Sequence, residues 1–214
     1  MKKTLVIILL FFTLIEASFL FAEEEKIPVI DFSGGYTKVK RVGNVDTVTL
    51  SDSAQVNTKD ISVTADEIEI SGENYRYLKC SGNVIAEEKQ NNIILKTPEL
   101  FYDRDKNTIL INSWIEIDDS ENEIKMSGAY LEFNLEQQLF NLQIDAEINK
   151  ATEKGQLIGK AASIIYNNKE KSLILQGNAS VTWGEDNYEA SLIRINLETE
   201  EIILEGKITG TVNG

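Results

Sequence analysis

A pattern of about thirty residues recurs along most of the chain, and it limits the folds that the chain can adopt. Each copy starts at a small residue, which is followed three and five residues later by apolar residues, then by a polar stretch and a second apolar pair. The small residues are Ala65, Thr97, Gly128, Ala161 and Ala190. A chain that repeats one short unit in this way forms a stack of similar units.

The apolar pairs alternate with polar residues, as expected for strands with one buried face. The polar stretches between them are rich in Asn, Asp and Glu, which favour tight turns. Beyond the N-terminal apolar segment, no stretch keeps a helical period with capping residues, so the sequence predicts an all-β protein. The paired positions are Ile68 and Ile70, Leu78 and Cys80, Leu100 and Tyr102, Ile109 and Ile111, Leu131 and Phe133, Phe140 and Leu142, Ile164 and Tyr166, Leu173 and Leu175, Ile193 and Ile195, and Ile202 and Leu204.

One detail of the repeat predicts a bend in every strand. Before each small residue the apolar positions follow at steps of two, as in Ile61 and Val63, but the next apolar residue comes at a step of three. Such a step moves side chains to the other face unless a bulge or a bend absorbs the extra residue. We therefore expect each strand to turn a corner at the small residue, with a second set of corners at Gly82, Ser113 and Gly177. The predicted architecture is an open jelly roll or sandwich, or a β-solenoid.

The N-terminal residues predict export from the cytoplasm. Lys2 and Lys3 precede an apolar run over 4–15, and Ala22 is the last residue before an acidic segment. This order is typical of a secretory signal that is cleaved after Ala22. The alternative is a retained anchor helix, which needs about 20 apolar residues. The sequence thus predicts a signal peptide over 1–22, an N-terminal extension over 23–31 and a single β-domain over 32–214.

Composition argues against several classes of function. The chain has 35 acidic and 21 basic residues and a formal net charge of −14, which argues against nucleic acid as a partner. It has no histidine and a single cysteine, Cys80, so histidine-based acid–base chemistry and His or Cys metal sites are excluded. We expect no cofactor, and we expect Cys80 to be a buried small residue in its strand.

Three other features are candidates for sites. The segment DRDKN (103–107) resembles the start of a calcium loop, but Thr108 and Trp114 stand where that loop needs Gly and Glu, so we expect a turn. The acidic segment 118–123 is expected to be a solvated connection. We expect Trp114 and Trp183 to pack in the core, with sugar stacking as the alternative. No carboxylate pair departs from its place in the repeat, so the sequence predicts a protein that is not an enzyme.

Several segments resemble one known family. The strand FSGGYTKVK (32–40), the run over 48–70 and YLKCSGNVIAEE (77–88) carry alternating strands, a G-N-A or S-A step and the pattern A-D-x-I-x-I. Later copies read LQGNASV (175–181) and ASLIRI (190–195). These segments resemble the OstA-like/LptA family of periplasmic lipopolysaccharide-transport bridge proteins, and the resemblance covers almost the whole chain after the N-terminal segment.

The resemblance implies an open, twisted antiparallel β-jelly roll in the periplasm. Its apolar interior would shield the acyl chains of lipopolysaccharide or a similar envelope glycolipid and pass them from the inner to the outer membrane. The apolar pairs named above, Cys80 excepted, would line that interior. The implied partners are further copies of the chain, joined head to tail, an inner-membrane-anchored jelly-roll subunit and an outer-membrane jelly-roll subunit.

The repeat pattern runs to the end of the given sequence without a capping element, which predicts an open edge for association with other chains. The expected edge residues are Ile203, Gly206, Ile208 and Val212. Two alternatives stay open from the sequence. One is a membrane-anchored, LptC-like subunit of the same pathway, and the other is a structural, self-assembling β-repeat protein without lipid transport.

Overall fold

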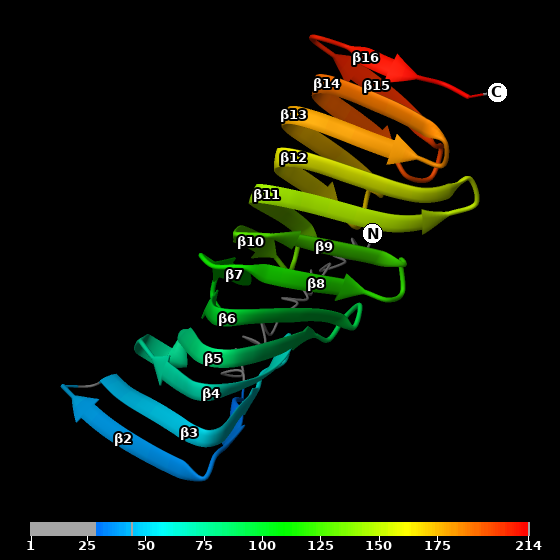
Figure 1. The fold of residues 1–214 in the computed structure, drawn as a ribbon. Helices are drawn as coiled ribbons and strands as arrows, with labels where there is room; N and C mark the ends of the chain where they lie inside the picture. The colour runs from blue at the N-terminus through cyan, green and yellow to red at the C-terminus, as the bar shows by residue number, and fades with distance from the viewer. Residues whose placement is uncertain (1–28, 44, 214) are drawn as a thin grey trace, which may run out of the picture.

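A computed structural model describes residues 29–43 and 45–213 of the chain. Within these ranges every strand belongs to one antiparallel sheet, and the one helical element is a short 3-10 turn, η1 (Glu73–Tyr75). The strands are stacked in sequence order into a long, twisted body (Figure 1). This confirms the predicted all-β class and the open, twisted antiparallel jelly roll. The predicted signal peptide and residues 23–28 lie outside the described residues.

The strands are β1 (Asp31–Ser33), β2 (Tyr36–Val42), β3 (Val45–Asn57), β4 (Ile61–Ser71), β5 (Tyr77–Glu88), β6 (Ile93–Asp103), β7 (Thr108–Ile111), β8 (Ile115–Asp119), β9 (Ile124–Gly128), β10 (Tyr130–Asn134), β11 (Leu139–Thr152), β12 (Gly155–Asn167), β13 (Ser172–Trp183), β14 (Asp186–Asn196), β15 (Glu201–Glu205) and β16 (Thr209–Thr211). In the described ranges no helix is long and apolar enough to cross a membrane.

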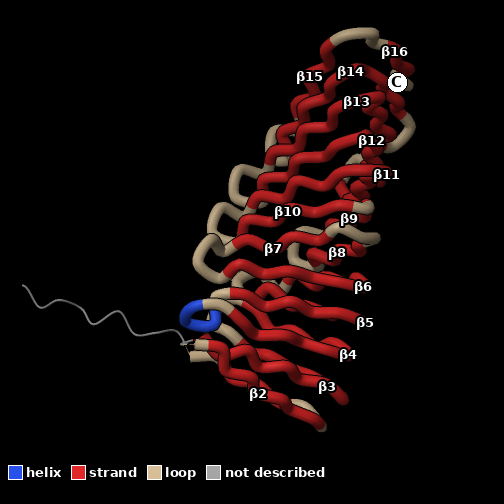
Figure 2. The backbone as a smooth tube through the Cα atoms, turned by 90° about the vertical axis from the view of Figure 1, so that its left-hand side faces the viewer, coloured by secondary structure: helices blue, strands red, loops and turns tan. Residues whose placement is uncertain are grey.

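The sheet is folded along its length into two layers, which we call the first and second wings. The first wing contains β2, β7, β10 and β15, and the second contains β1, β8, β9 and β16. Each of the long strands β3–β6 and β11–β14 crosses the fold line, so one half of it belongs to the first wing and the other half to the second. Figure 2 looks onto the fold line between the wings, with β7 and β10 on one side of it and β8 and β9 on the other.

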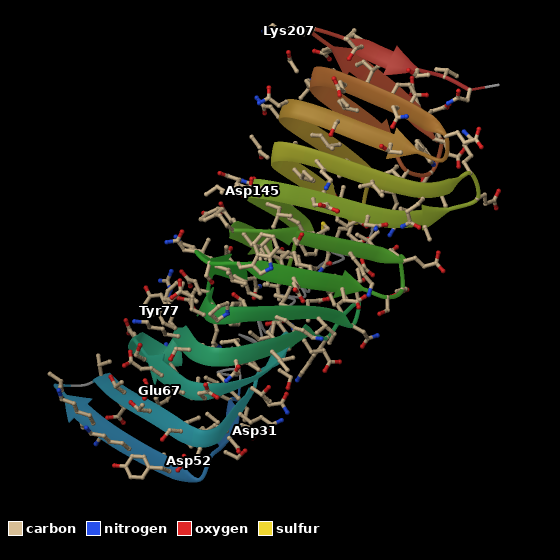
Figure 3. The ribbon with its side chains drawn as sticks, viewed as in Figure 1. Asp31, Asp52, Glu67, Tyr77, Asp145 and Lys207 are labelled. Atoms are coloured by element: carbon tan, nitrogen blue, oxygen red, sulfur yellow. The ribbon has the colours of Figure 1, made fainter. Side chains whose placement is uncertain are left out.

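The fold line lies where the sequence predicted corners. The pairing register shifts between Thr64 and Glu67 in β4, and equivalent shifts occur in the other long strands. Alternate strands turn this corner through two successive residues with positive φ, such as Gly82 and Asn83. The other such pairs are Asp52 and Ser53, Ile144 and Asp145, Gly177 and Asn178, and Gly206 and Lys207. Asp145 and Lys207 mark this fold line at the left margin of Figure 3.

Glycine is needed at the corner of β5 for two reasons. Gly82 has φ +74°, a conformation that side chains with a Cβ rarely adopt. A Cβ at this position would also lie 2.3 Å from Oδ2 of Asp66, which turns the corner of the neighbouring strand β4. Asn83 Nδ2 donates a hydrogen bond of 2.9 Å to the same Asp66 oxygen. Adjacent corners are therefore in direct contact, which accounts for the small residues in the repeat.

The polar stretches form tight turns with a common construction. The last residue of the strand accepts hydrogen bonds from backbone N–H groups in the turn, as Asp103 does from Asp105 and Lys106. Four residues later the backbone has positive φ, as at Asn107. The segments over 103–107 and 118–123 are thus turns or strand ends, as predicted. Among the described residues no group of three or more acidic or cysteine side chains is placed to hold a metal ion.

Candidate functional site

The candidate site is the apolar space between the two wings. Of the interior positions that the sequence predicted, all but two are at most 2% exposed. The buried positions are Ile68, Ile70, Leu78, Leu100, Tyr102, Ile109, Ile111, Leu131, Phe133, Phe140, Leu142, Ile164, Tyr166, Leu173, Leu175, Ile193 and Ile195. All of them lie on the first wing, where every second side chain along a strand points into the interior.

The two exceptions are Ile202 and Leu204, which are only half-buried. They lie on β15 at the C-terminal end of the first wing, where no further strand of the described chain covers them. Their side chains still pack against the buried core from its end.

Sequence reasoning missed the half of the site that the second wing provides. The signal was present, because Ile61 and Val63 belong to the step-of-two pattern before a small residue. The second wing carries smaller inward residues than the first, with Ala and Val at many positions. Its inward residues are Ala54, Val56, Ile61, Val63, Val84, Ala86, Ile93, Leu95, Ile115, Ile117, Ile124, Met126, Ala146, Ile148, Leu157, Ala179, Val181, Trp183 and Ala190.

A row of stacked aromatic rings lies in the middle of the first wing. The rings of Phe133 and Phe140 are 3.8 Å apart between centroids, and those of Phe140 and Tyr166 are 5.7 Å apart. The Tyr166 hydroxyl donates to Asn168 Oδ1 at 2.9 Å, in the turn after β12. Burial raises the pKa of Tyr166 well above its usual value. The ring faces therefore extend the apolar interior, while the hydroxyl reaches its polar margin.

The two wings meet again along a line opposite the fold line, which we call the mouth. It is formed by two rows of turns: 72–76, 104–107, 135–138, 168–171 and 197–200 from the first wing, and 58–60, 89–92, 120–123, 153–154 and 184–185 from the second. The polar contacts that cross it within the described ranges include Tyr102 Oη to Asp60 Oδ2 at 3.4 Å, Gln138 Nε2 to Glu88 Oε1 at 3.4 Å, Lys171 Nζ to Asn122 Oδ1 at 2.6 Å, and Lys154 Nζ to Glu200 Oε2 at 2.6 Å.

The space between the wings is filled by side chains of the protein. Tyr102, Phe133 and Phe140 are all fully buried, as are most of their inward neighbours. Two cavities lie at the mouth, with volumes of about 620 and 210 Å³. Because a packed interior has few voids larger than a water molecule, a long apolar ligand can occupy this space only if the wings move apart.

The prediction for Trp114 was wrong. Its side chain is 48% exposed and lines a cavity of about 350 Å³ on the outer face of the second wing. The reason is local, since β7 ends at Ile111 and β8 begins at Ile115, so Trp114 lies in the connection between wings. Trp183 is buried, as predicted, and its Nε1 donates to Thr152 Oγ1 at 2.8 Å.

The two ends of the body expose sheet edges of different charge. The N-terminal edge strand of the first wing, β2, carries Lys38, Lys40 and Arg41 and no acidic residue. The C-terminal edge strand, β15, carries Glu201 and Glu205 and no basic residue. The predicted edge residues lie at this C-terminal end, where Ile203, Ile208 and Val212 are 46%, 55% and 70% exposed and Gly206 turns the corner between β15 and β16.

Comparison with known proteins gives the following similarities. A family model described as "LptA/(LptD N-terminal domain) LPS transport protein" matches residues 78–201. Among solved structures, the chain matches the crystal structure of LptH, described as the LptA-homologous periplasmic component of the lipopolysaccharide transport device of Pseudomonas aeruginosa. That match has 8% sequence identity and a TM-score of 0.25, and it covers 87% of this chain and 96% of LptH. A search of curated proteins gave no match.

Proposed function

The chain belongs to the LptA/LptD N-terminal-domain family of lipopolysaccharide transport proteins, and from this premise we propose that it is a bridge subunit that holds glycolipid acyl chains between its two wings. It would pass them along the jelly roll from the inner to the outer membrane. The single observation that carries the proposal is the continuous apolar interior, which extends over both wings from Val48 in β3 to Ile195 in β14.

Under this proposal, the polar contacts that cross the mouth set the free energy needed to open it. Tyr102, Gln138 and Lys171 each form a cross-wing hydrogen bond in which one partner is charged, and such a bond contributes about 1.5–3 kcal/mol net. An acyl chain that enters between the wings replaces apolar protein contacts with apolar lipid contacts, so most of the hydrophobic stabilisation is kept. The polar turns would then contact the headgroup, because phosphate and sugar groups stay in water.

Head-to-tail association is supported by strand direction and by charge. The strands of the first wing alternate in direction from β2 to β15, so β2 of a second copy would continue the antiparallel order beside β15. Lys38 and Lys40 of β2 are on the outward face, as are Glu201 and Glu205 of β15. Opposite charges on the same face of neighbouring strands stabilise their pairing.

The interior would also continue across such a junction. Val39 on β2 pairs with Val48, which faces the interior, and it is 61% exposed at the N-terminal end. Ile202 and Leu204 occupy the corresponding inward positions on β15. A second copy would cover these residues and extend one apolar surface from chain to chain, with the same geometry available to the jelly-roll partners at either membrane.

We place this protein in the periplasm and assign it no catalytic step. Support for the location comes from the signal-like residues at its N-terminus and from the family. N-terminal sequencing of the exported protein distinguishes the bridge subunit from the membrane-anchored alternative. A start at Glu23 fits a released subunit, whereas a retained Met1 fits an anchor.

Site-specific photo-crosslinking in cells tests the lipid proposal. A photoreactive amino acid is placed at the inward positions Tyr102 and Phe133, and at the matched outward neighbours Phe101 and Glu132. We expect adducts with lipopolysaccharide from the inward positions and few or none from the outward ones. Equal capture, or no capture, at all four positions would favour the structural β-repeat alternative.

A further inference from the structure

Several lysines of the mouth have ammonium groups that donate hydrogen bonds to neutral oxygens. Lys89 Nζ donates to the Thr58 carbonyl oxygen at 2.7 Å, and Lys169 Nζ donates to the Glu136 carbonyl oxygen at 2.6 Å. Within the described ranges neither ammonium forms an ion pair with a carboxylate. A hydrogen bond to a neutral carbonyl fixes the position of the charge without neutralising it.

Two lysines on the outer face of the second wing form ion pairs. Lys125 pairs with Asp118 at 3.3 Å on the second wing, and Lys160 pairs with Glu147 at 2.8 Å. In a chain with a formal net charge of −14, carboxylate partners are abundant. Lys89 and Lys169 contact carbonyl oxygens instead, in contrast to Lys154, which pairs with Glu200 elsewhere along the mouth.

These two lysines, together with Lys59, line the larger mouth cavity of about 620 Å³. The cavity lies between the two rows of turns, because Lys59 and Lys89 belong to the second wing and Lys169 belongs to the first. A ligand there would contact both wings at the margin of the apolar interior.

Three acidic residues also line this cavity, and the carboxylates of two of them, Glu88 and Asp60, contact other groups of the protein. Glu88 is 3% exposed, and its carboxylate accepts backbone N–H groups from Gln90 and Asn91 at 3.0 and 2.9 Å. Asp60 Oδ2 lies 3.4 Å from the Tyr102 hydroxyl, which is also 3.1 Å from Asn107 Oδ1. Glu136 is exposed at the rim and offers its carbonyl oxygen to Lys169.

A second, smaller cavity repeats the arrangement further along the mouth. Its volume is about 210 Å³, and Lys150 and Lys171 line it. Lys150 Nζ donates to the Asn122 carbonyl oxygen at 2.6 Å, and Lys171 Nζ donates to the Oδ1 atoms of Asn122 and Asn168 at 2.6 and 2.7 Å. Both ammonium groups again contact neutral oxygens.

We propose that the mouth lysines Lys59, Lys89 and Lys169 bind a phosphate group of an anionic glycolipid whose acyl chains lie between the wings. This inference rests on the proposed function and adds to it the headgroup chemistry. An ammonium retains further N–H donors after one carbonyl contact, and charge-assisted hydrogen bonds to phosphate are the stronger kind. The lysines of the smaller cavity offer a second position for a phosphate as the lipid moves along.

The test compares binding of lipid A and of enzymatically dephosphorylated lipid A to the purified full-length chain. The triple variant Lys59→Gln, Lys89→Gln, Lys169→Gln is measured beside a matched control, Lys79→Gln, Lys96→Gln, Lys125→Gln, which removes the same charge from the outer faces. We expect the mouth variant to bind lipid A about tenfold more weakly or worse and to bind the dephosphorylated lipid unchanged. The control variant should change both by less than about twofold.

The other outcomes separate the phosphate site from the acyl-chain proposal. Equal affinity of the wild-type chain for the two lipids, with no effect of the mouth variant, overturns the phosphate site and leaves the acyl-chain proposal intact. Lack of binding to either lipid overturns the proposed function as well. If inorganic phosphate alone binds as tightly as lipid A, the site is a free-phosphate site. Circular dichroism melting of each variant shows whether a loss of binding reflects unfolding.

Discussion

Lys154 and Glu200 lie on turns of opposite wings, and their side chains form an ion pair of 2.6 Å across the mouth. The Glu200 carboxylate raises the pKa of Lys154. This pair belongs to the polar contacts that close the mouth, whereas the interior behind them is apolar and closely packed. The wings are thus joined covalently along the fold line and by polar side chains along the opposite margin.

Tyr102→Phe tests the function of the mouth contacts. The change removes a hydroxyl that lies 3.4 Å from Asp60 Oδ2 on the other wing and 3.1 Å from Asn107 Oδ1 in its own wing. We therefore expect faster lipid uptake, together with a loss of about 1 kcal/mol in unfolding free energy. Tyr166→Phe is the matched control, since its hydroxyl bonds Asn168 in its own wing. It should lower stability to a similar extent and leave the uptake rate unchanged. Stopped-flow fluorescence with a labelled lipid measures the rates, and equal acceleration in both variants would contradict the role of the cross-wing contact.

Phe140→Ala tests how closely the interior is packed. Phe140 is fully buried and stacks on Phe133 and Tyr166, so we expect a loss of about 3–5 kcal/mol in urea unfolding. Its neighbour Asn141 faces outward, and Asn141→Ala should cost much less. A small effect at Phe140 would mean that the interior is loosely filled.

Gly82→Ala tests the construction of the fold line. A methyl group at this position would meet Asp66, and the positive φ adds strain, so we expect a loss of more than about 1 kcal/mol in stability. Gly43 also has positive φ, but nothing lies within 4 Å of a Cβ built there. Gly43→Ala should therefore lower stability only through the strain of a positive φ. Equal losses of unfolding free energy at both sites would argue against contact between corners.

We expect the buried thiol of Cys80 to contribute to a decline in folding stability at alkaline pH. Burial raises the pKa of its thiol from 9.0 to about 12 in the folded chain. The unfolded chain therefore releases this proton first, and the stabilising effect, complete below pH 9, is lost as the pH rises toward 12. We expect Cys80→Ala to flatten the decline between these values by up to about 1.4 kcal/mol per pH unit. Chemical denaturation at about pH 8, 9.5 and 11 measures it, and parallel curves for the two proteins would contradict the expectation.

Charge reversal tests head-to-tail association through β2 and β15. We expect self-association to weaken as salt rises above about 0.15 M, where screening extends over about 8 Å. Lys38→Glu with Lys40→Glu should abolish it, as should Glu201→Lys with Glu205→Lys. A mixture of the two variants should associate again, because one acidic β2 meets one basic β15. Analytical ultracentrifugation measures the masses, and failure of the mixture to associate would exclude these edges as the electrostatic contact.

The sequence predicted the first wing well, because pairs of bulky apolar residues recur from Ile68 and Ile70 to Ile193 and Ile195 and mark one face of each strand. The step of three residues predicted one set of corners, such as the one at Ala65, and small residues after the second apolar pair predicted another, to which Gly82 and Gly177 belong. Both glycines have positive φ at the fold line. The second wing was overlooked as part of the site because residues such as Ala86 and Val181 give a weaker hydrophobic signal than Leu, Phe or Tyr.

The mouth could not be predicted from the sequence. Tyr102 and Asp60 are 42 residues apart, and Gln138 and Glu88 are 50 apart, so their contacts depend on the twist and on the angle between the wings. Trp114 was misplaced for a local reason, because the corner predicted at Ser113 is a connection that leaves the sheet between β7 and β8.

The distance between the wings, measured with and without lipid, shows whether acyl chains enter the interior. Spin labels are attached in a Cys80→Ala background at Gln90 and Glu136, which are exposed on facing turns of the two wings. A control pair at Glu136 and Glu170 lies within the first wing. We expect lipopolysaccharide to lengthen the first distance and leave the second unchanged. Stoichiometric lipid binding with neither distance altered would contradict the claim that acyl chains occupy the space between the wings.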